Sequence, residues 1–457
     1  MNKFLISFGM ILIVSCNSST KNPADNPPMV KLITLDPGHF HAALVQKSMY
    51  PNVDSVVQVY APGGSDLQLH LDRITAFNKR PAEPTHWKEE VYSGNDYFEK
   101  MLEEKKGNVV MLAGNNQKKT EYILKSLQAG LNVLADKPMA INATNFEMLK
   151  KAFETAKEKN LLLYDIMTER FEITTVLQRE LSMMPEVFGT LEKGTADNPA
   201  VIKESHHNFY KYISGSVLTR PAWFMDVSQQ GEGIVDVTTH LVDLVQWECF
   251  PDQAIDYTKD INVLSAKHWP VNMSFSQFKT ITKLDSIPAF LKQNVVQDSL
   301  LQIYSNGEIN YQIRGVHAKV SVIWDYQSPG GADTHFSNMR GTKTKLVVRQ
   351  GAEQQYKPTL YIEPINNTPD YEKTVTEQVA KLQSKYPGIE LKKISTGWEM
   401  IIPEKYKEGH EAHFARVTQK FLAYLNEHNI PQWEVAGMLA KYYTTTKALE
   451  IALKTKP

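Results

Sequence analysis

The chain has 457 residues and a formal net charge of −1, with 50 lysine and arginine residues against 51 aspartate and glutamate residues. This balance, together with the absence of basic runs, argues against a nucleic-acid-binding protein. The length suggests two domains whose core is large enough to need no disulfide staples, and the only cysteines are Cys16 and Cys249.

Residues 1–15 predict a lipoprotein signal peptide. Lys3 precedes an apolar run, 4–14, that is too short to span a membrane as a stable helix. The run ends Ile13-Val14-Ser15-Cys16, which resembles a bacterial lipobox, where the cysteine becomes the lipidated first residue. The alternative is an ordinary signal peptide with an incidental cysteine. Residues 16–28 are polar and predict a flexible tether. We therefore expect an exported protein, lipid-anchored to the bacterial membrane and facing the periplasm or the cell surface.

Residues 29–170 alternate between strand-like and helix-like patterns. We expect strands at 31–35, 55–61, 108–114, 131–135 and 161–167, and helices at 40–49, from 66, at 120–129 and at 145–157. Gly130 is a typical residue just past a helix end. Such alternation predicts a Rossmann-type, doubly wound parallel sheet that forms a dinucleotide-binding domain.

Residues 171–457 predict a second α/β domain with a largely antiparallel sheet. Asn306-Gly307 lies between apolar runs at 300–304 and 309–313 and suggests a hairpin with a type I′ turn. Further strands are expected at 318–324, 344–348 and 359–362, and a C-terminal helical extension at 370–385, 408–425 and 433–453. The sheet of this domain is a candidate surface for homo-oligomer formation.

The segment Gly231–Trp247 carries the most specific polar pattern. It reads as a helix that follows two glycines. Offsets of four and seven residues place Asp236, His240 and Asp243 on one helix face, and a separate apolar face carries Val237, Leu241, Leu244 and Val245. We expect one face to be buried and the other to offer an imidazole and two acids to a cleft. Histidine titrates near neutral pH and so suits proton transfer.

Two further signatures accompany this helix. Ala135-Asp136-Lys137-Pro138-Met139-Ala140 looks like a Glu-Lys-Pro strand end, and Asn115 and Asn116 follow a strand where a Pro-Asn turn is expected. In order and separation the three signatures resemble the Gfo/Idh/MocA oxidoreductase family, the group of glucose-fructose oxidoreductase and the inositol dehydrogenases. The resemblance covers roughly residues 29–362.

The resemblance implies hydride transfer between an alcohol carbon of a carbohydrate and NAD or NADP. Lys137 would lie beside the nicotinamide and the reacting carbon, Asp236 would hold substrate hydroxyls, and His240 would accept the proton of the reacting hydroxyl. Asp243 is a further candidate for substrate binding, or it pairs within the fold. Tyr164 and Arg170 follow the last Rossmann-type strand, so they either line the cleft or pack at the sheet end.

The cofactor fingerprint Gly-x-Gly-x-x-Gly is altered to Asp36-Pro37-Gly38-His39-Phe40-His41. We expect the Gly38 backbone to approach the pyrophosphate, and the other cofactor-binding candidates are His39, Phe40, Asn115, Asn116 and Lys137. The acid expected about twenty residues later is missing. No metal site is assigned, because His410-Glu411-Ala412-His413 spaces its histidines three residues apart rather than four, which favours a cleft-lining or solvated helix start. Alternatively, His39 and His41 handle substrate or metal.

These features favour a nicotinamide-dependent oxidoreductase that acts on a sugar or glycoside hydroxyl, within a simple oxidation or a redox-assisted cleavage or epimerisation. An exported protein meets little free nicotinamide, so the cofactor would be retained through the turnover. Two alternatives stay open: a non-redox hydrolase or lyase that uses His240 with Asp236 or a metal, and a catalytically silent glycan-binding lipoprotein.

Overall fold

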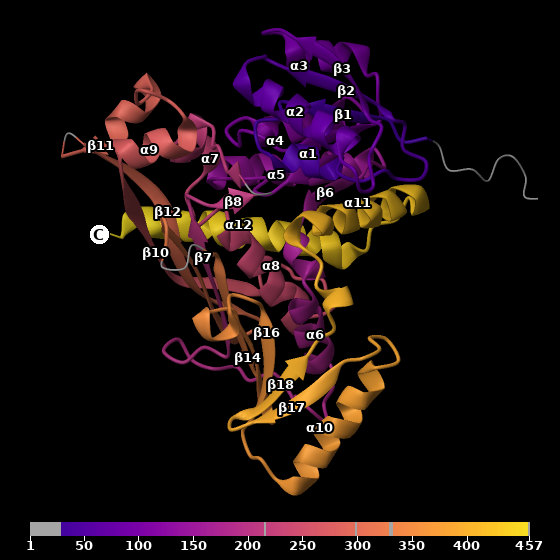
Figure 1. The fold of residues 1–457 in the computed structure, drawn as a ribbon, viewed down its shortest axis with the longest axis vertical. Coiled ribbons are helices and arrows are strands. Elements are labelled where there is room, and N and C mark those ends of the chain that lie inside the picture. The colour runs from indigo at the N-terminus through magenta and orange to yellow at the C-terminus, as the bar shows by residue number, and fades with distance from the viewer. Residues whose placement is uncertain (1–28, 214–215, 298, 329–331, 456–457) are drawn as a thin grey trace, which may run out of the picture.

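The computed structural model describes residues 29–213, 216–297, 299–328 and 332–455. The predicted signal peptide, the tether and Cys16 lie outside the described residues. Within the described part, no helix is both long enough and apolar enough to cross a membrane. Two large sheets organise the rest of the chain, with the first third of the sequence around one and most of the remainder around the other (Figure 1).

The first sheet has six strands, all parallel, in the order β3-β2-β1-β4-β5-β6. This order confirms the Rossmann-type prediction. The strands are β1 (Leu32–Leu35), β2 (Val56–Ala61), β3 (Lys88–Ser93), β4 (Val109–Leu112), β5 (Asn132–Asp136) and β6 (Leu163–Ile166). Its helices are α1 (His41–Val45), α2 (Ser65–Lys79), α3 (Tyr97–Glu104), α4 (Lys119–Gln128) and α5 (Ala143–Glu158). Apolar runs predict the buried central strands, whereas the exposed edge strand β3 lacks such a run and was not predicted.

The second sheet has ten strands and is antiparallel except where β13 pairs with β7. Its path is β10-β12-β13-β7-β14-β15-β16-β18-β17, with β11 beside β12. The strands are β7 (Val201–Asn208), β10 (Ile261–Ser274), β11 (Val295–Val296), β12 (Leu300–Ile313), β13 (Val316–Asp325), β14 (Thr334–Arg340), β15 (Thr344–Arg349), β16 (Thr359–Pro364), β17 (Glu390–Ile394) and β18 (Gly397–Ile401). The mostly antiparallel sheet confirms the fold class predicted for this part of the chain.

The predicted hairpin at Asn306-Gly307 is wrong, because β12 runs without interruption through both residues. A Cβ atom on Gly307 would lie 2.7 Å from Cβ of Ile234, so glycine is needed here for close packing rather than for a turn. The Asn306 side chain donates to the Trp269 carbonyl at 3.1 Å and accepts from the Trp324 amide at 2.7 Å. The middle of β12 therefore supports the segment that carries Asp236.

The remaining helices cover the second sheet or lie between the two sheets. They are α6 (Ile173–Ser182), α7 (Val227–Gln230), α8 (Thr238–Cys249), α9 (Phe275–Thr282), α10 (Pro369–Leu382), α11 (His410–Glu427) and α12 (Gln432–Lys454). The last two, drawn in yellow in Figure 1, connect the domains: α11 packs on α1 and β6, and α12 packs on α5, α8 and β10. The C-terminal helical extension thus contributes to both hydrophobic cores.

Helix α8 differs from its prediction in two respects. It begins at Thr238, so Asp236 lies in the preceding turn, where its amide donates to the Glu232 carbonyl at 3.0 Å. The helix is also buried nearly all round, with Asp243 as deeply buried as Leu241. The predicted division into a buried face and a cleft face is wrong, because α6 and α12 cover the sides of α8 that the sheet does not.

Candidate active site

A lysine from the first domain meets an aspartate from the second. Lys137 follows directly after β5, at the sheet edge where doubly wound folds bind ligands. Its Nζ donates to Oδ1 of Asp236 at 2.5 Å, and Nε2 of Gln230 donates to Asp236 Oδ2 at 3.0 Å. The Lys137 and Asp236 side chains are 10% and 7% exposed. The domains therefore share a largely buried ion pair.

His240 lies in the first turn of α8, one helical turn beyond Asp236. The residue is 8% exposed, and its Nδ1 has no hydrogen-bond partner among the described residues. Burial, and then the charge of Lys137, lower the pKa of the imidazole to about 4. The ring is therefore neutral near pH 7 and able to accept a proton. A buried nitrogen without a partner is unusual in proteins and marks an atom that a ligand or water can satisfy.

A second group of polar side chains borders His240 from the C-terminal extension. His410, the first residue of α11, lies 3.6 Å from Glu169 through its Nε2 and 3.3 Å from the hydroxyl of Thr168. One helical turn later, His413 is buried with both ring nitrogens unpartnered in the described structure. Sequence reasoning gave His410 and His413 only as part of a cleft-lining or solvated helix start, and it did not single out Thr168 or Glu169. No sequence pattern predicts that α11 lies beside β6 and α8, because this contact forms only when the C-terminal helices pack back onto the first domain.

The turn after β1 is closed on itself. The Gly38 amide donates to the Asp36 carbonyl at 2.9 Å, and the His39 amide donates to the Ala113 carbonyl at 3.1 Å. These two amides are therefore not free donors, as a pyrophosphate loop would offer. The His39 side chain extends toward Asp136. The Phe40 ring packs against the His39 ring, with the two ring centroids 4.7 Å apart.

Asn115 and Asn116 follow β4 and bind the second domain. Asn115 Nδ2 donates to Gln229 Oε1 at 2.7 Å, and Asn116 Nδ2 donates to the Gln230 carbonyl at 2.7 Å. Through Gln230, this turn is connected to the Lys137–Asp236 pair. Oδ1 of Asn116 is buried and has no hydrogen-bond partner in the described part of the chain.

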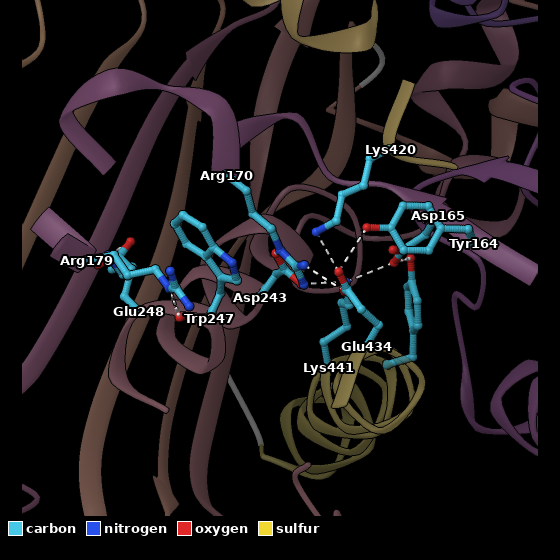
Figure 2. A network of polar contacts seen from close by, with 12 residues as sticks. Tyr164, Asp165, Arg170, Arg179, Asp243, Trp247, Glu248, Lys420, Glu434 and Lys441 are labelled. Atoms are coloured by element: carbon cyan, nitrogen blue, oxygen red, sulfur yellow. Dashed lines mark hydrogen bonds and ion pairs between the residues drawn. The ribbon is translucent and has the colours of Figure 1, made fainter. Parts of the chain in front are cut away.

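For Asp243, Arg170 and Tyr164, the structure shows pairing within the fold, the alternative given for them above. Arg170 donates to both Asp243 oxygens at 2.6 Å and to Glu434 at 2.8 Å, and the Tyr164 hydroxyl donates to Glu434 at 3.2 Å (Figure 2). Lys441, which is fully buried, pairs with both Asp243 and Asp165. All of these polar groups have partners within the fold, which favours a structural role, and their contacts with a substrate stay a prediction.

Comparisons with known proteins agree with this architecture. Residues 177–453 match the family model described as "Putative oxidoreductase C terminal domain", and residues 40–165 match "Oxidoreductase family, NAD-binding Rossmann fold". The crystal structure of a "putative oxidoreductase" from Parabacteroides merdae is 58% identical, with a TM-score of 0.92, over 94% of this chain and 99% of that chain. The chain belongs to the Gfo/Idh/MocA oxidoreductase family.

Solved structures of much lower sequence identity share the fold. Levoglucosan dehydrogenase, solved with NADH and levoglucosan, is 13% identical with a TM-score of 0.59, over 93% of this chain and 97% of that chain. GenD2 from gentamicin A biosynthesis, solved with NAD, is 14% identical with a TM-score of 0.56, over 94% and 95%. A comparison with proteins of curated function gives no match.

The first domain is an NAD-binding Rossmann domain of this family. A cavity of about 950 Å³ lies at the carboxyl ends of β1 and β2, lined by Asp36 and Pro37, by 61–67 and by parts of the second domain around Trp223 and Phe290. Doubly wound folds bind the adenosine half of a dinucleotide in this position, and the volume suits it. The cavity thus fits the cofactor in place and size, although β2 ends in Ala61 and not in an acid.

Proposed function

We propose that the protein is a nicotinamide-dependent oxidoreductase that acts on a hydroxyl group of a sugar or glycoside. The observation that carries the proposal is the meeting of Lys137, Asp236 and His240 between the domains, with a neutral imidazole whose Nδ1 is buried and unpartnered. Oxidation of an alcohol requires a base for the hydroxyl proton and a positive charge for the developing alkoxide. His240 and Lys137 supply these two groups.

The residues divide the work by their chemistry. His240 takes the hydroxyl proton on its free ring nitrogen. The Lys137 ammonium stabilises the negative charge that then develops on the substrate oxygen. Asp236 fixes the Lys137 ammonium through Oδ1, and its Oδ2, which accepts from Gln230, is the oxygen that a neighbouring substrate hydroxyl reaches. Such a clamp positions a polyol without adding a reactive group.

The nicotinamide, when bound, supplies the hydride acceptor. Residues 36–38 and 61–67 would hold the adenosine half of the dinucleotide in the large cavity. Lys137 and Oδ1 of Asn116 would lie at its nicotinamide end. The two closed amides at Gly38 and His39 imply that this chain holds the pyrophosphate with fewer backbone donors than the family fingerprint provides.

A carbohydrate substrate is supported by the levoglucosan dehydrogenase fold neighbour and by the polar composition of the site. Cofactor retention suits a reaction that oxidises and re-reduces the sugar within one turnover, such as a redox-assisted cleavage or epimerisation. We also propose that the protein acts outside the cytoplasm, attached to the membrane through lipid on Cys16, because the sequence before residue 17 has the pattern of a lipoprotein signal.

Denaturing the purified protein and identifying the released small molecules by absorbance and mass tests this proposal. We expect NAD or NADP, in oxidised or reduced form. If none is released and neither form binds when added, the redox function is contradicted. Chelator-sensitive turnover of a glycoside would then point to a non-redox hydrolase or lyase, and tight sugar binding without turnover would point to a glycan-binding protein.

A further inference from the structure

Two histidines and an aspartate converge where β1 and β5 end. His39 lies in the turn after β1, His41 is the first residue of α1, and Asp136 is the last residue of β5. Nδ1 of His41 lies 2.9 Å and Nδ1 of His39 lies 3.7 Å from the same oxygen, Oδ2 of Asp136. The two imidazole rings meet edge to face with centroids 4.0 Å apart. One ligand atom from each residue lies within 4.8 Å of the other two.

These separations are close to those around a small divalent cation. Imidazole nitrogens and carboxylate oxygens bind zinc at about 2.0–2.2 Å. Neighbouring ligand atoms in such a shell are about 3.0 Å apart in octahedral geometry and about 3.4 Å apart in tetrahedral geometry. The observed distances of 2.9 and 3.7 Å fall on either side of this range. The Asp136 oxygen therefore already lies close to shell spacing from both imidazoles.

The other polar contact of Asp136 leaves its side chain available to a metal ion. Lys119 donates to the backbone carbonyl of Asp136 at 3.1 Å, which leaves the Asp136 carboxylate to the two imidazoles.

We propose that His39, His41 and Asp136 bind a divalent transition-metal ion such as zinc or cobalt. Two imidazoles and one carboxylate form a donor set that such ions prefer. Among the described residues no further histidine, cysteine or acidic side chain joins this group, so the ion keeps coordination positions for water or for an oxygen of the substrate. Asp136 immediately precedes Lys137, so these positions lie beside the proposed active site. The inference does not depend on a nicotinamide cofactor.

Titration of the chelator-stripped, full-length protein with Co²⁺ tests the proposal. Cobalt bound by nitrogen and oxygen ligands has visible absorption bands that report its coordination, so the readout needs no activity. We expect saturation at one ion per chain, with displacement by zinc. His41→Gln and Asp136→Asn should each weaken binding on the order of 100-fold or more, because each removes a ligand. His39→Gln removes the most exposed ligand and is the variant least disturbing to the fold.

Two control variants make the titration specific. His206 pairs with Asp325 at 2.8 Å on the second sheet, so His206→Gln removes a histidine–aspartate pair elsewhere and should leave cobalt binding unchanged. His410→Gln tests the neighbouring histidine group, and binding should again be retained. The proposal is overturned if the wild-type protein shows no saturable binding below about 100 μM. It is also overturned if His39→Gln, with a wild-type unfolding transition, binds cobalt as tightly as the wild-type protein does.

Discussion

At the residue scale, Asp36 shows how this chain retains a tight turn without the first glycine of the fingerprint. Its φ is 49°, in the left-handed region that aspartate tolerates better than most residues. The carboxylate accepts from the hydroxyls of Tyr97 and Tyr122 at 3.4 and 3.3 Å, and burial raises its pKa. The two tyrosine hydroxyls therefore hold the Asp36 carboxylate within the first domain.

His240→Ala is expected to lower turnover by roughly two to four orders of magnitude, the usual range for loss of a general base. The imidazole makes no hydrogen bond through Nδ1 in the described structure, so its removal should leave the fold intact. Initial rates and the unfolding midpoint of the same preparation check both expectations. His206→Ala, which removes a partly exposed histidine that pairs with Asp325 on the second sheet, is the matched control and should retain wild-type turnover. A His240→Ala enzyme with near-normal turnover would refute the assignment.

At the element scale, a buried ionic network connects β6, α8 and α12. Asp165 is the last-but-one residue of β6, and Asp243 lies on α8. Lys441 on α12 pairs with both carboxylates. Arg170 connects the same Asp243 to Glu434. Because these elements come from both domains, the network fixes α8, and with it His240, relative to the strand ends that carry Lys137.

Arg170→Met should destabilise the protein by about 3–5 kcal/mol, the range for removing one partner of a buried ion pair. The substitution leaves Asp243 and Glu434 with less compensation in a buried site. Denaturant unfolding at neutral pH measures the change in free energy. Arg416 pairs with Glu408 at the surface of α11 and is half-exposed, so Arg416→Met should change stability by about 1 kcal/mol or less. Equal effects of the two substitutions would contradict a structural role for the network.

Local sequence patterns predicted most elements but not the contacts between distant ones. The apolar runs gave five of the six strands of the first sheet, and the residues after β5 pointed to Lys137. The Asn306-Gly307 pair was misjudged because a turn signal and a close-packing glycine look alike in sequence, and only the contact with Ile234 distinguishes them. For Arg170 and Asp243 the sequence could not decide between substrate binding and pairing within the fold, because their partners Glu434 and Lys441 are nearly two hundred or more residues away in the chain.

At the scale of the whole molecule, buried histidines should make stability depend on pH. Burial lowers the pKa of His413, and lowers the pKa of His240 and His335 to about 4. Since their folded pKa values lie below the ordinary value of 6.5, the unfolded chain binds more protons between the two values. The contribution of these histidines to stability is therefore fully present above about pH 6.5 and is lost as the pH falls toward 4.

His413→Leu isolates this contribution, since both ring nitrogens of His413 are buried without partners in the described structure. The stability of the variant relative to wild type should improve as the pH is lowered from 7.5 to about 5. Urea unfolding at several pH values measures this difference. His86→Leu changes an exposed histidine and should show no such trend. A pH-independent difference for His413→Leu would mean that His413 does not resist protonation in the folded state.

Membrane attachment is expected to depend on one atom, the Cys16 sulfur. Cys16→Ser should release the protein from the membrane fraction, because the remaining tether, 17–28, is polar and no described helix can span a bilayer. Fractionation of cells that express each form measures the distribution. Cys249→Ser, which changes the other cysteine, should stay with the membranes as the wild-type protein does. Sedimentation of the Cys16→Ser protein with membranes would contradict lipid anchoring.

The central claim is that a hydride leaves a sugar carbon for a nicotinamide held beside Lys137 and His240. The most direct measurement mixes the full-length protein, carrying oxidised nicotinamide cofactor, with a glycoside deuterated on its ring carbons, denatures the protein within the first turnover, and determines the mass of the released cofactor. The account predicts a reduced nicotinamide about one mass unit heavier than the unlabelled reduced cofactor, formed at a rate that His240→Ala lowers together with turnover. Product formation in which no deuterium lies on the nicotinamide at any time within the turnover would contradict it.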